Sequence, residues 1–325
     1  MMRWAMLLGL LGLALATGLI VWSGFDAVLQ ALAQAGFVGI VVTSLFHLCS
    51  MLVASYGWMI LLTPASRPGW GFFLYMLWLR VSVNNLLPVA RIGGEVVAVR
   101  VMMQRGIRRG PAIASTVVET TVSVIGQFAF TLLGVALFLM QFSNRDLALQ
   151  LLLGLLISLL LLGAMIYVQR LGAFGILTKI FTLLFRDKWQ KFAGNTAALD
   201  RAVHVLYRRR DRILWCTIAQ FVGWLLGSVE IWLALHFIGH PLSLAECIMI
   251  EAVVQAAGSA AFIVPGALGV QEAAFLLFGQ MLGLTPENAA ALAIIRRCRD
   301  LLLYVPGLIA WQIQEGKLLF RKRQT

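Results

Sequence analysis

The sequence predicts an all-α polytopic membrane protein with about six full spans and two opposed re-entrant helical hairpins arranged as an inverted repeat. Three observations lead to this fold class. The mean hydropathy of the 325-residue chain is +0.89 and only 12% of its residues are charged, too few to cover a soluble domain of this size. Apolar segments of membrane-spanning length recur along the chain. Two further apolar regions are interrupted by proline and charged residues.

A helix needs about 20 residues to cross the hydrocarbon core of a bilayer. The segments that meet this length are 4–23, 37–62, 112–140, 147–168, 212–238 and 289–314. The first is too long for a signal peptide and lacks a small-residue cleavage site, so we expect it to span the membrane. Between the first two, apolar residues at 25, 28, 29 and 32 have helical spacing and predict a short interfacial helix.

Basic residues predict the sidedness of the chain, because lysine and arginine favour cytoplasmic loops. The connector 169–211 is rich in both, so we expect it and both termini in the cytoplasm of a bacterial cell, with the spans in the inner membrane. The loops at 142–146, 239–243 and 284–288 carry one arginine in total and should face outside. The net charge of +12 fits contact with anionic lipid headgroups. No motif indicates a nucleic-acid partner.

The regions 71–104 and 244–283 are each too long for one span and too short for two, and are broken by Pro88 and Pro265. Arginines flank the first region on both sides, which predicts a hairpin that enters and leaves on the cytoplasmic side. The second is flanked by outside loops and should enter from there. Such broken backbone is tolerated where it is buried in protein or lines a wet cavity. The alternative, a tilted span plus an interfacial helix in each region, would place the basic turn 105–109 outside.

The two broken regions match each other at an offset of 177 (265 − 88). The aligned pairs are Pro88 with Pro265, Ala90 with Ala267, Glu95 with Glu272, Gly106 with Gly283, Ala112 with Ala289 and Ala114 with Ala291. The same offset places Glu119 opposite Arg296, an acid opposite a base. We therefore expect one membrane domain over 1–325 that contains two inverted units, 37–140 and 212–314. If the hairpin tips meet, the first contributes the cation Arg91, and the second, which has Leu268 there, contributes mainly shape and a carboxylate.

Charged residues at membrane depth indicate the candidate site. These are Arg80, Arg91, Glu95, Glu119, Glu230, Glu251, Glu272, Arg296, Arg297, Arg299 and Asp300. Each costs roughly 2.5–3.5 kcal/mol at the centre of a span, so they must face one another, a polar cavity or a ligand. Helical spacing of four places Arg91 near Glu95 and Arg296 near Asp300. The alternative role of these pairs is to hold the broken helices together, and Glu230 and Glu251 fit a hydrogen bond to a neighbouring helix.

The deep cations are all arginine, whose planar fork matches phosphate oxygens. A glycine pair at 93–94 would let a headgroup approach the backbone. The predicted substrate-binding residues are Arg80, Asn84, Asn85, Arg91, Gly93, Gly94, Glu95, Glu119, Glu272, Arg296, Arg299 and Asp300.

Metal, cofactor and catalytic signatures are weak. The four cysteines lie in apolar stretches without CxxC spacing, and the four histidines are scattered. HExxH, GxSxG and P-loop motifs are missing from the sequence. We therefore expect no metal, no cofactor and no enzyme activity, with a membrane-embedded transferase that uses a glutamate base as the alternative.

The run NNLLPVARIGGEVVAVRVMMQRG, followed by the Glu119 span, resembles the membrane domain of the lysylphosphatidylglycerol synthase/flippase superfamily, in particular its hopanoid-biosynthesis-associated branch. The later VPGALGVQEAA is similar to the second half of that domain. The resemblance covers nearly the whole chain. It implies the lipid-translocating part of the family, without the aminoacyl-transfer domain.

The expected function is that of a flippase, which moves a phospholipid or other polar-headed lipid between leaflets. In this hypothesis the arginines bind phosphate, the carboxylates hold them or exchange partners with the headgroup, and the hairpins rock to alternate access. The expected partners are the bilayer and a lipid with an anionic or zwitterionic headgroup; a homo-oligomer is left open. The alternatives are a non-transporting scaffold for lipid-modifying enzymes, which would bind them through the basic connector, and a secondary transporter of a small anionic solute.

Overall fold

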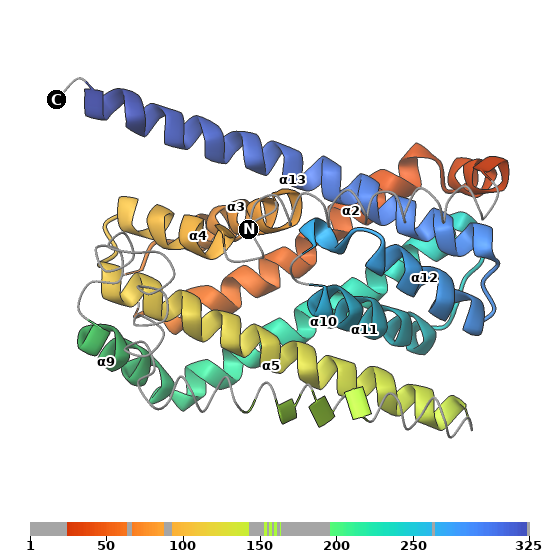
Figure 1. Ribbon diagram of the computed structural model, residues 1–325, viewed down its shortest axis with the longest axis horizontal. Coiled ribbons are helices and arrows are strands. Elements are labelled where there is room, and N and C mark those ends of the chain that lie inside the picture. The colour runs from red at the N-terminus through yellow and green to blue at the C-terminus, as the bar shows by residue number, and fades with distance from the viewer. Residues whose placement is uncertain are drawn as a thin grey trace.

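The computed structural model describes residues 25–63, 67–87, 93–142, 196–261 and 264–323, together with isolated positions between 153 and 163. In these ranges the chain is helical and contains no strand, which confirms the all-α prediction for them (Figure 1). The helices are α2 (Phe25–Leu61), α3 (Trp70–Leu86), α4 (Gly93–Gln104), α5 (Arg109–Gln141), α9 (Thr196–Tyr207), α10 (Arg210–Ile238), α11 (Leu244–Ala260), α12 (Val270–Met281) and α13 (Pro286–Arg323), with a 3-10 turn at Pro265–Ala267.

Within the described ranges, three helical segments are long and apolar enough to cross a membrane: Ala35–Leu61, Arg109–Gln141 and Arg210–Ile238. They correspond to the predicted spans 37–62, 112–140 and 212–238. Helix α13 covers the predicted span 289–314, but the charged run from Arg296 to Asp300 makes it too polar to be identified by composition. The predicted span 4–23 lies outside the described residues, and so does 147–168 apart from the isolated positions.

Helix α2 changes direction at Gly36, whose φ of 64° and ψ of 172° lie outside the helical region. A positive φ strains residues that carry a Cβ, so glycine suits this kink. Residues 25–35 are helical, as their apolar spacing predicts, and the kink at Gly36 separates this short helix from the span that follows. Whether this first part lies at the membrane interface stays a prediction.

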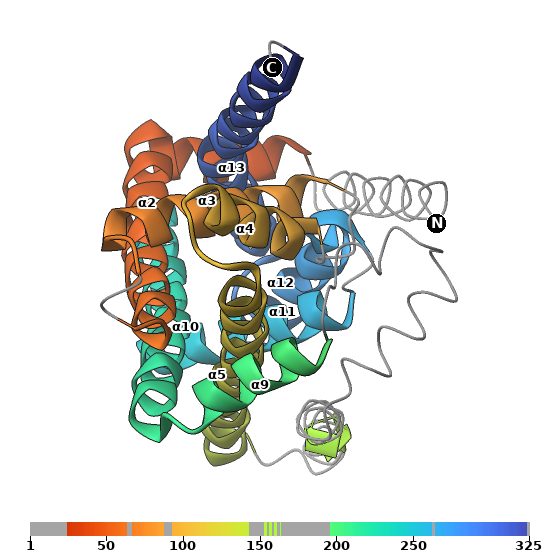
Figure 2. The ribbon, with the colours of Figure 1, turned by 90° about the vertical axis from the view of Figure 1, so that its left-hand side faces the viewer.

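Helices α2 and α10 lie side by side (Figures 1 and 2). Small residues bring them close: a Cβ at Gly39 would lie 2.9 Å from the Phe237 Cβ, and one at Gly57 would lie 2.9 Å from the Ala219 Cβ. These contacts pair the start of one helix with the end of the other, so the two run antiparallel. Close backbone approach through small residues is typical of packed membrane helices.

Each of the two broken regions forms an antiparallel helix pair. In the first, Phe72 of α3 and Arg105 after α4 line one pocket at the open end, and Asn84 Oδ1 accepts a hydrogen bond of 2.8 Å from the Gly94 N–H near the tip. In the second, α11 and α12 pack together, with Gly258 against Gln271 near the tip. Pro88 lies outside the described residues, and Pro265 begins the 3-10 turn between α11 and α12.

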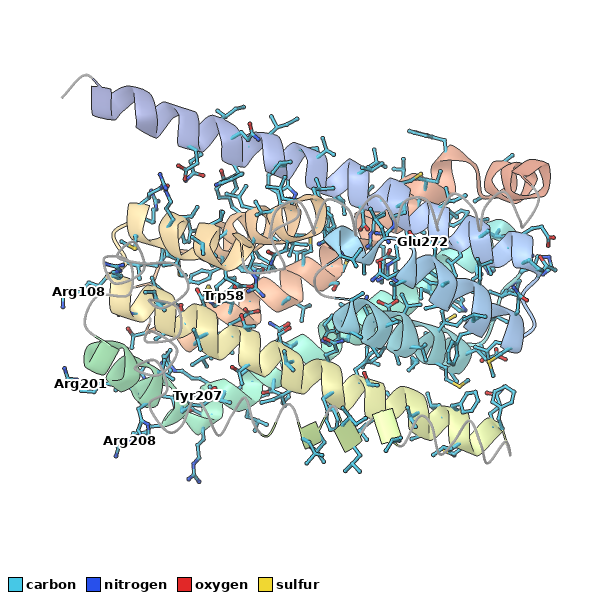
Figure 3. The ribbon with its side chains drawn as sticks, viewed as in Figure 1. Trp58, Arg108, Arg201, Tyr207, Arg208 and Glu272 are labelled. Carbon is cyan, nitrogen blue, oxygen red and sulfur yellow. The ribbon has the colours of Figure 1, made fainter. Side chains whose placement is uncertain are left out.

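The two hairpins open toward opposite ends of the molecule and meet at their tips. The first opens where α5 and α10 begin; at this end lie Arg108, Arg201 and Arg208 (Figure 3). The second opens where α5 and α10 end. At the tips, a Cβ at Gly266 would lie only 3.1 Å from the carbonyl oxygen of Asn85. Arg91, the cation expected at the first tip, lies outside the described residues.

Helix boundaries recur at the offset found in the sequence. Helices α2 and α10 end 177 residues apart (238 − 61), α4 and α12 begin and end 177 apart (270 − 93 and 281 − 104), and α5 and α13 begin 177 apart (286 − 109). Helix α11 follows α3 by 174 (244 − 70). The connection between α10 and α11 is therefore shorter than the one between α2 and α3. The connection between α11 and α12 is longer than the one between α3 and α4. Gly106 and Gly283, which lie two residues after the ends of α4 and α12, have φ of 89° and 90°. These coincidences favour the two-unit division proposed below.

Two apolar clusters pack around the hairpins. One surrounds Trp58, Phe73 and Met102 and joins the first hairpin to the end of α2 and the start of α5. The other surrounds Leu235 and Phe275 and joins the second hairpin to the end of α10 and the start of α13. Within a bilayer such clusters hold helices together by close van der Waals packing. Between the two clusters lies the polar region described next.

Candidate functional site

A cavity of about 420 Å³ lies where the hairpin tips and the long helices meet. Its lining comes from α2, α3, α4, α5, α10, α11, α12 and α13. Predicted site residues at its wall are Arg80, Asn84, Asn85, Glu95, Glu119, Arg296, Arg299 and Asp300. The structure thus brings most of the predicted site together around one polar space.

The remaining predicted residues lie elsewhere or are not described. Arg91 falls outside the described residues. Gly93 begins α4, and a Cβ at Gly94 would run into the Arg80 carbonyl oxygen and the Asn84 side chain. Gly94 therefore allows the two arms of the hairpin to pack. Glu272 is buried behind the cavity wall, well inside the helical bundle (Figure 3).

The first charged group joins α3, α4 and α5. The Arg80 guanidinium binds Glu119 through Nη1, and its Nε lies 3.0 Å from Glu95 Oε1. Gln220 of α10 donates a 2.9 Å hydrogen bond to the other Glu119 oxygen. The guanidinium also lies 4.8 Å from the centre of the Trp58 ring, a cation–π contact. One arginine therefore serves two carboxylates, the buried Glu119 and the partly exposed Glu95.

The second charged group joins α11 and α13. Arg296 binds Glu251 in a bidentate pair, with Nη1–Oε2 and Nη2–Oε1 distances of 2.5 and 2.9 Å. Gln255 donates a 2.6 Å hydrogen bond to Glu251 Oε1. The Arg296 guanidinium lies 5.5 Å from the centre of the Phe275 ring. This group mirrors the first, with the charges of the hairpin arm and the long helix exchanged.

The third charged group surrounds Arg299 on α13. Its Nη1 lies 2.7 and 2.9 Å from the two oxygens of Glu230, and its Nη2 lies 2.5 Å from Asp300 Oδ1. His47 Nδ1 lies 2.8 Å from Glu230 Oε2, and His47 Nε2 lies 3.0 Å from the Tyr304 hydroxyl. All five side chains are buried or nearly so.

His47 and Tyr304 belong to the site but were not among the residues predicted from the sequence. A histidine or tyrosine in an apolar span most often packs in the core. The usable signal is that His47 and Glu230 are ionisable residues inside otherwise apolar spans, which is a reason to expect function.

Arg297 and Asp300 correct the expected pairing on α13. The spacing predicts Arg296 with Asp300, but Asp300 binds Arg299 and, at 3.3 Å, Arg297 Nη1. Arg297 Nε lies 2.5 Å from Glu272 Oε1, and Glu272 Oε2 accepts a 2.7 Å bond from the Gly269 N–H. Spacing along one helix cannot foresee that carboxylates from α10 and α11 reach Arg299 and Arg296 first. The Arg297–Glu272 pair fastens the second hairpin tip to α13.

Every deep arginine in the described ranges is bound to a carboxylate. The arginines are Arg80, Arg296, Arg297 and Arg299, and the carboxylates are Glu95, Glu119, Glu230, Glu251, Glu272 and Asp300. Among these described residues six carboxylates face four arginines, so an anion that binds here competes with them for the guanidinium groups. In the same ranges no group of three or more His, Cys, Asp or Glu side chains is arranged to hold a metal ion.

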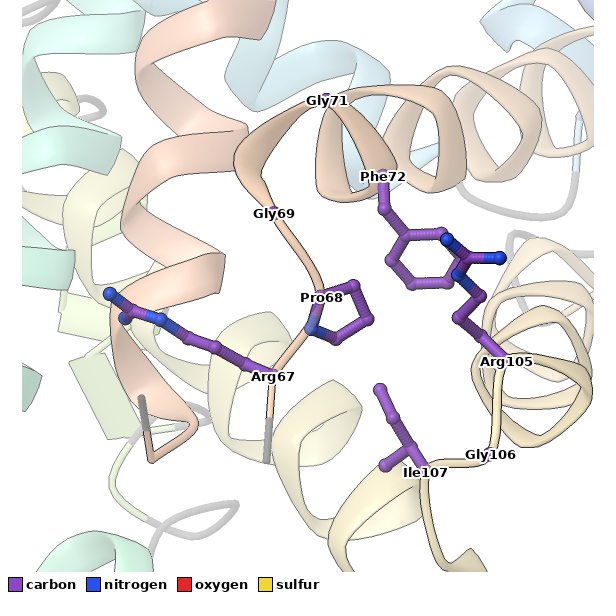
Figure 4. A pocket seen from close by; sticks show the side chains of 8 residues that line it. All are labelled: Arg67, Pro68, Gly69, Gly71, Phe72, Arg105, Gly106 and Ile107. Atoms are coloured by element: carbon purple, nitrogen blue, oxygen red, sulfur yellow. The ribbon is translucent and has the colours of Figure 1, made fainter. Parts of the chain in front are cut away.

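A second, surface pocket lies at the open end of the first hairpin (Figure 4). It has a volume of about 600 Å³, and Arg67, Phe72 and Arg105 are among its lining side chains. An adjoining groove of about 790 Å³ shares Phe72 and Arg105 and continues along α13 past Ile313. The Arg67 side chain points away from Phe72 and Arg105, and its Nη1 donates a 3.0 Å hydrogen bond to the Met59 carbonyl oxygen (Figure 4). Arg105 beside apolar surface suits the boundary between headgroups and acyl chains.

The comparisons with known proteins decide the family. Residues 9–307 match the family described as the lysylphosphatidylglycerol synthase TM region. The chain belongs to this family. It is also similar to the UPF0104 membrane protein of Pyrococcus horikoshii, at 22% identity over 341 residues, which cover 98% of this chain and 97% of the relative. No solved structure matches the chain. The resemblance found in the sequence is confirmed at the level of the family.

Proposed function

We propose that this family member is a lipid flippase, whose central cavity binds the polar headgroup while the lipid passes between leaflets. The observation that carries the proposal is the cavity of about 420 Å³, lined by buried arginine–carboxylate pairs, at the meeting point of two opposed hairpin tips. Buried pairs that only fasten helices are a costly device, because apolar residues of similar volume often stabilise as well. Charged pairs at this depth are expected where side chains must release one charged group and bind another.

The substrate class follows from the donors. Arginine offers parallel N–H groups that match phosphate oxygens, and Arg296 and Arg299 already make bidentate or paired contacts with carboxylates. A headgroup phosphate would replace a carboxylate at one of them. The surplus of carboxylates leaves acceptors for an ammonium group. A phospholipid with an anionic or zwitterionic headgroup therefore fits the cavity.

The topology proposed is six full spans with two re-entrant hairpins, in units 37–140 and 212–314 of one domain. The opposite openings of the hairpins and the recurring helix boundaries support it. The end that carries Arg108, Arg201 and Arg208 would be cytoplasmic, together with the connector 169–211 and both termini. We place the protein in a bacterial inner membrane on this basis. Rocking of the hairpin tips against each other would open the cavity to each side in turn.

The surface pocket at Arg67 and Arg105 would be the first contact for lipids of the cytoplasmic leaflet. Anionic headgroups concentrate near basic side chains at a membrane surface, at about 1 kcal/mol per residue. The adjoining apolar groove along α13 would hold acyl-chain carbons. The hopanoid-associated branch of the family, and with it a hopanoid-related lipid, remains part of the proposal.

The test is a leaflet-resolved assay in vesicles of phosphatidylcholine that contain fluorescent phosphatidylglycerol and the purified protein. Externally added dithionite bleaches the fluorophore in the outer leaflet only. We expect bleaching to proceed beyond the half reached in protein-free vesicles. Bleaching that stops at the protein-free level would refute transport of this lipid. Repeating it with fluorescent phosphatidylethanolamine covers the zwitterionic class, and failure with both would favour the scaffold alternative.

A further inference from the structure

His47 faces two partners with opposite demands on the same nitrogen. Its Nδ1 lies 2.8 Å from Glu230 Oε2 and 3.1 Å from Arg299 Nη1. An arginine guanidinium only donates hydrogen bonds, and an ionised carboxylate only accepts them. The imidazole nitrogen can therefore satisfy one neighbour at a time. With a proton it donates to Glu230, and without one it accepts from Arg299.

The other ring nitrogen fits both states. His47 Nε2 lies 3.0 Å from the Tyr304 hydroxyl, and a hydroxyl both donates and accepts. Tyr304 can accept from Nε2–H or donate to a bare Nε2. A change of protonation at His47 thus leaves no unpaired group at this end of the ring.

The charges around His47 come from three sides. Helix α10 contributes Glu230, and α13 contributes Arg299, Asp300 and Tyr304. Across the cavity, α3 contributes Arg80, α4 contributes Glu95, α5 contributes Glu119, and α13 also contributes Arg296. Arg299 is the cation that touches both His47 and Glu230. If it moves, Glu230 loses its direct positive partner and His47 loses its donor.

We propose that His47 takes up a proton when a headgroup phosphate draws Arg299 away from Glu230, so that lipid movement is coupled to proton movement. This inference rests on the flippase function proposed above. In the bound state, Arg299 donates to phosphate oxygens. A proton from the bulk solution reaches His47 through cavity water and bonds to Nδ1, whose N–H then donates to the ionised Glu230 carboxylate. When the headgroup leaves, Arg299 returns to Glu230 and His47 releases the proton to water.

Histidine suits this role because one ring nitrogen can gain or lose a proton while the other keeps its hydrogen bond. Amide and hydroxyl side chains, among them Gln127, Gln255 and Ser259, line the cavity. Water held by this polar lining can bring the proton to His47. A cycle that opens to each side in turn would carry one proton with each headgroup.

The test uses vesicles of phosphatidylcholine with fluorescent phosphatidylglycerol, an imposed gradient of about one pH unit and a pH-sensitive dye inside. Coupling of one proton to one lipid can sustain up to an about tenfold ratio of labelled lipid between leaflets. We expect wild type to show this asymmetry, and the internal pH to move with the lipid. Equal leaflets under the gradient, with lipid movement intact, would overturn the coupling and leave the flippase standing. If wild type moves no lipid, both proposals fall.

Variants add a second arm to this test. His47→Gln keeps a hydrogen-bonding side chain that cannot carry a proton, so lipid should still move but settle equally between leaflets whatever the gradient. The matched control is His240→Gln, an exposed histidine after α10, which should keep the coupling of wild type. Gradient-driven asymmetry that persists in His47→Gln would remove His47 from the proposal. The wild-type arm decides the coupling even if this variant folds poorly.

Discussion

Glu119 and Arg296 occupy the same place in the two halves of the molecule and carry opposite charges. Each lies ten residues after the start of its helix (119 − 109 and 296 − 286). Each is bound to an opposite charge on the first arm of its own hairpin, Arg80 in one half and Glu251 in the other. The two halves thus use one architectural device with reversed polarity.

Breaking the Arg80–Glu119 pair should destabilise the protein more than removing both partners. In the single variant Arg80→Leu, Glu119 is left buried without its counter-charge, which typically costs about 3–5 kcal/mol. The double variant Arg80→Leu with Glu119→Leu leaves only Glu95 to be neutralised, so it should recover part of that loss. The midpoint temperatures of thermal unfolding in detergent rank the stability of wild type, the single variant and the double variant. A single variant as stable as the double would contradict the account.

Glycine at 94 should be required for the first hairpin. A Cβ at this position meets the Arg80 carbonyl oxygen and the Asn84 side chain, and overpacking of this kind typically costs about 1–3 kcal/mol. Gly94→Ala should therefore lower the thermal midpoint. Gly71→Ala is the control, because a Cβ there has nothing within 4 Å. Equal midpoints for the two variants would show that the arms do not pack as described.

Cysteine labelling should place the two hairpin openings on opposite sides of the membrane. Arg108 is exposed just before α5 begins (Figure 3), and His240 is exposed just after α10 ends. Single cysteines can be introduced at both positions after the four native cysteines are replaced. An impermeant maleimide should label Arg108→Cys only from the cytoplasmic side and His240→Cys only from outside. Labelling of Arg108→Cys from outside would overturn the first re-entrant hairpin.

The surface pocket should select anionic lipid in the cytoplasmic leaflet. Removing the charges in Arg67→Gln with Arg105→Gln should weaken the dependence of the flipping rate on phosphatidylglycerol content, at about 1 kcal/mol per charge or roughly fivefold each. Flipping of phosphatidylethanolamine should change less. The check is the flipping rate in vesicles of graded phosphatidylglycerol content. An unchanged dependence would exclude the pocket as the first contact.

Much of the architecture could be predicted because it depends on patterns within one segment. Apolar length located α2, α5 and α10, and the prolines with the recurring Glu95 and Glu272 located the hairpins and their offset. The gathering of charges could also be foreseen, since charges at depth have nowhere else to go. The same reasoning found Arg80, Glu119, Arg296 and Arg299 at one cavity.

The partners of those charges could not be predicted, because they are set by how helices pack. Arg296 faces Glu251 on α11 and not Asp300 on its own helix. Glu95 faces Arg80, the cation across the hairpin. His47 enters the site because α2 packs against both α10 and α13. Such long-range contacts leave no trace in the local spacing of residues.

The measurement that tests the central claim most directly is the leaflet-resolved assay on two neutralised ion pairs. Arg80→Gln with Glu119→Gln removes one of the ion pairs at the cavity but keeps hydrogen-bonding side chains. Arg100→Gln with Glu315→Gln removes an ion pair with an Nη2–Oε2 distance of 2.6 Å at the surface of the helical bundle, where the Arg100 side chain is 54% exposed. If headgroups pass through the cavity, the first variant should flip phosphatidylglycerol at least about tenfold more slowly, which corresponds to about 1.4 kcal/mol. The second should flip at the wild-type rate. Equal rates in all three proteins would contradict a headgroup path through this cavity.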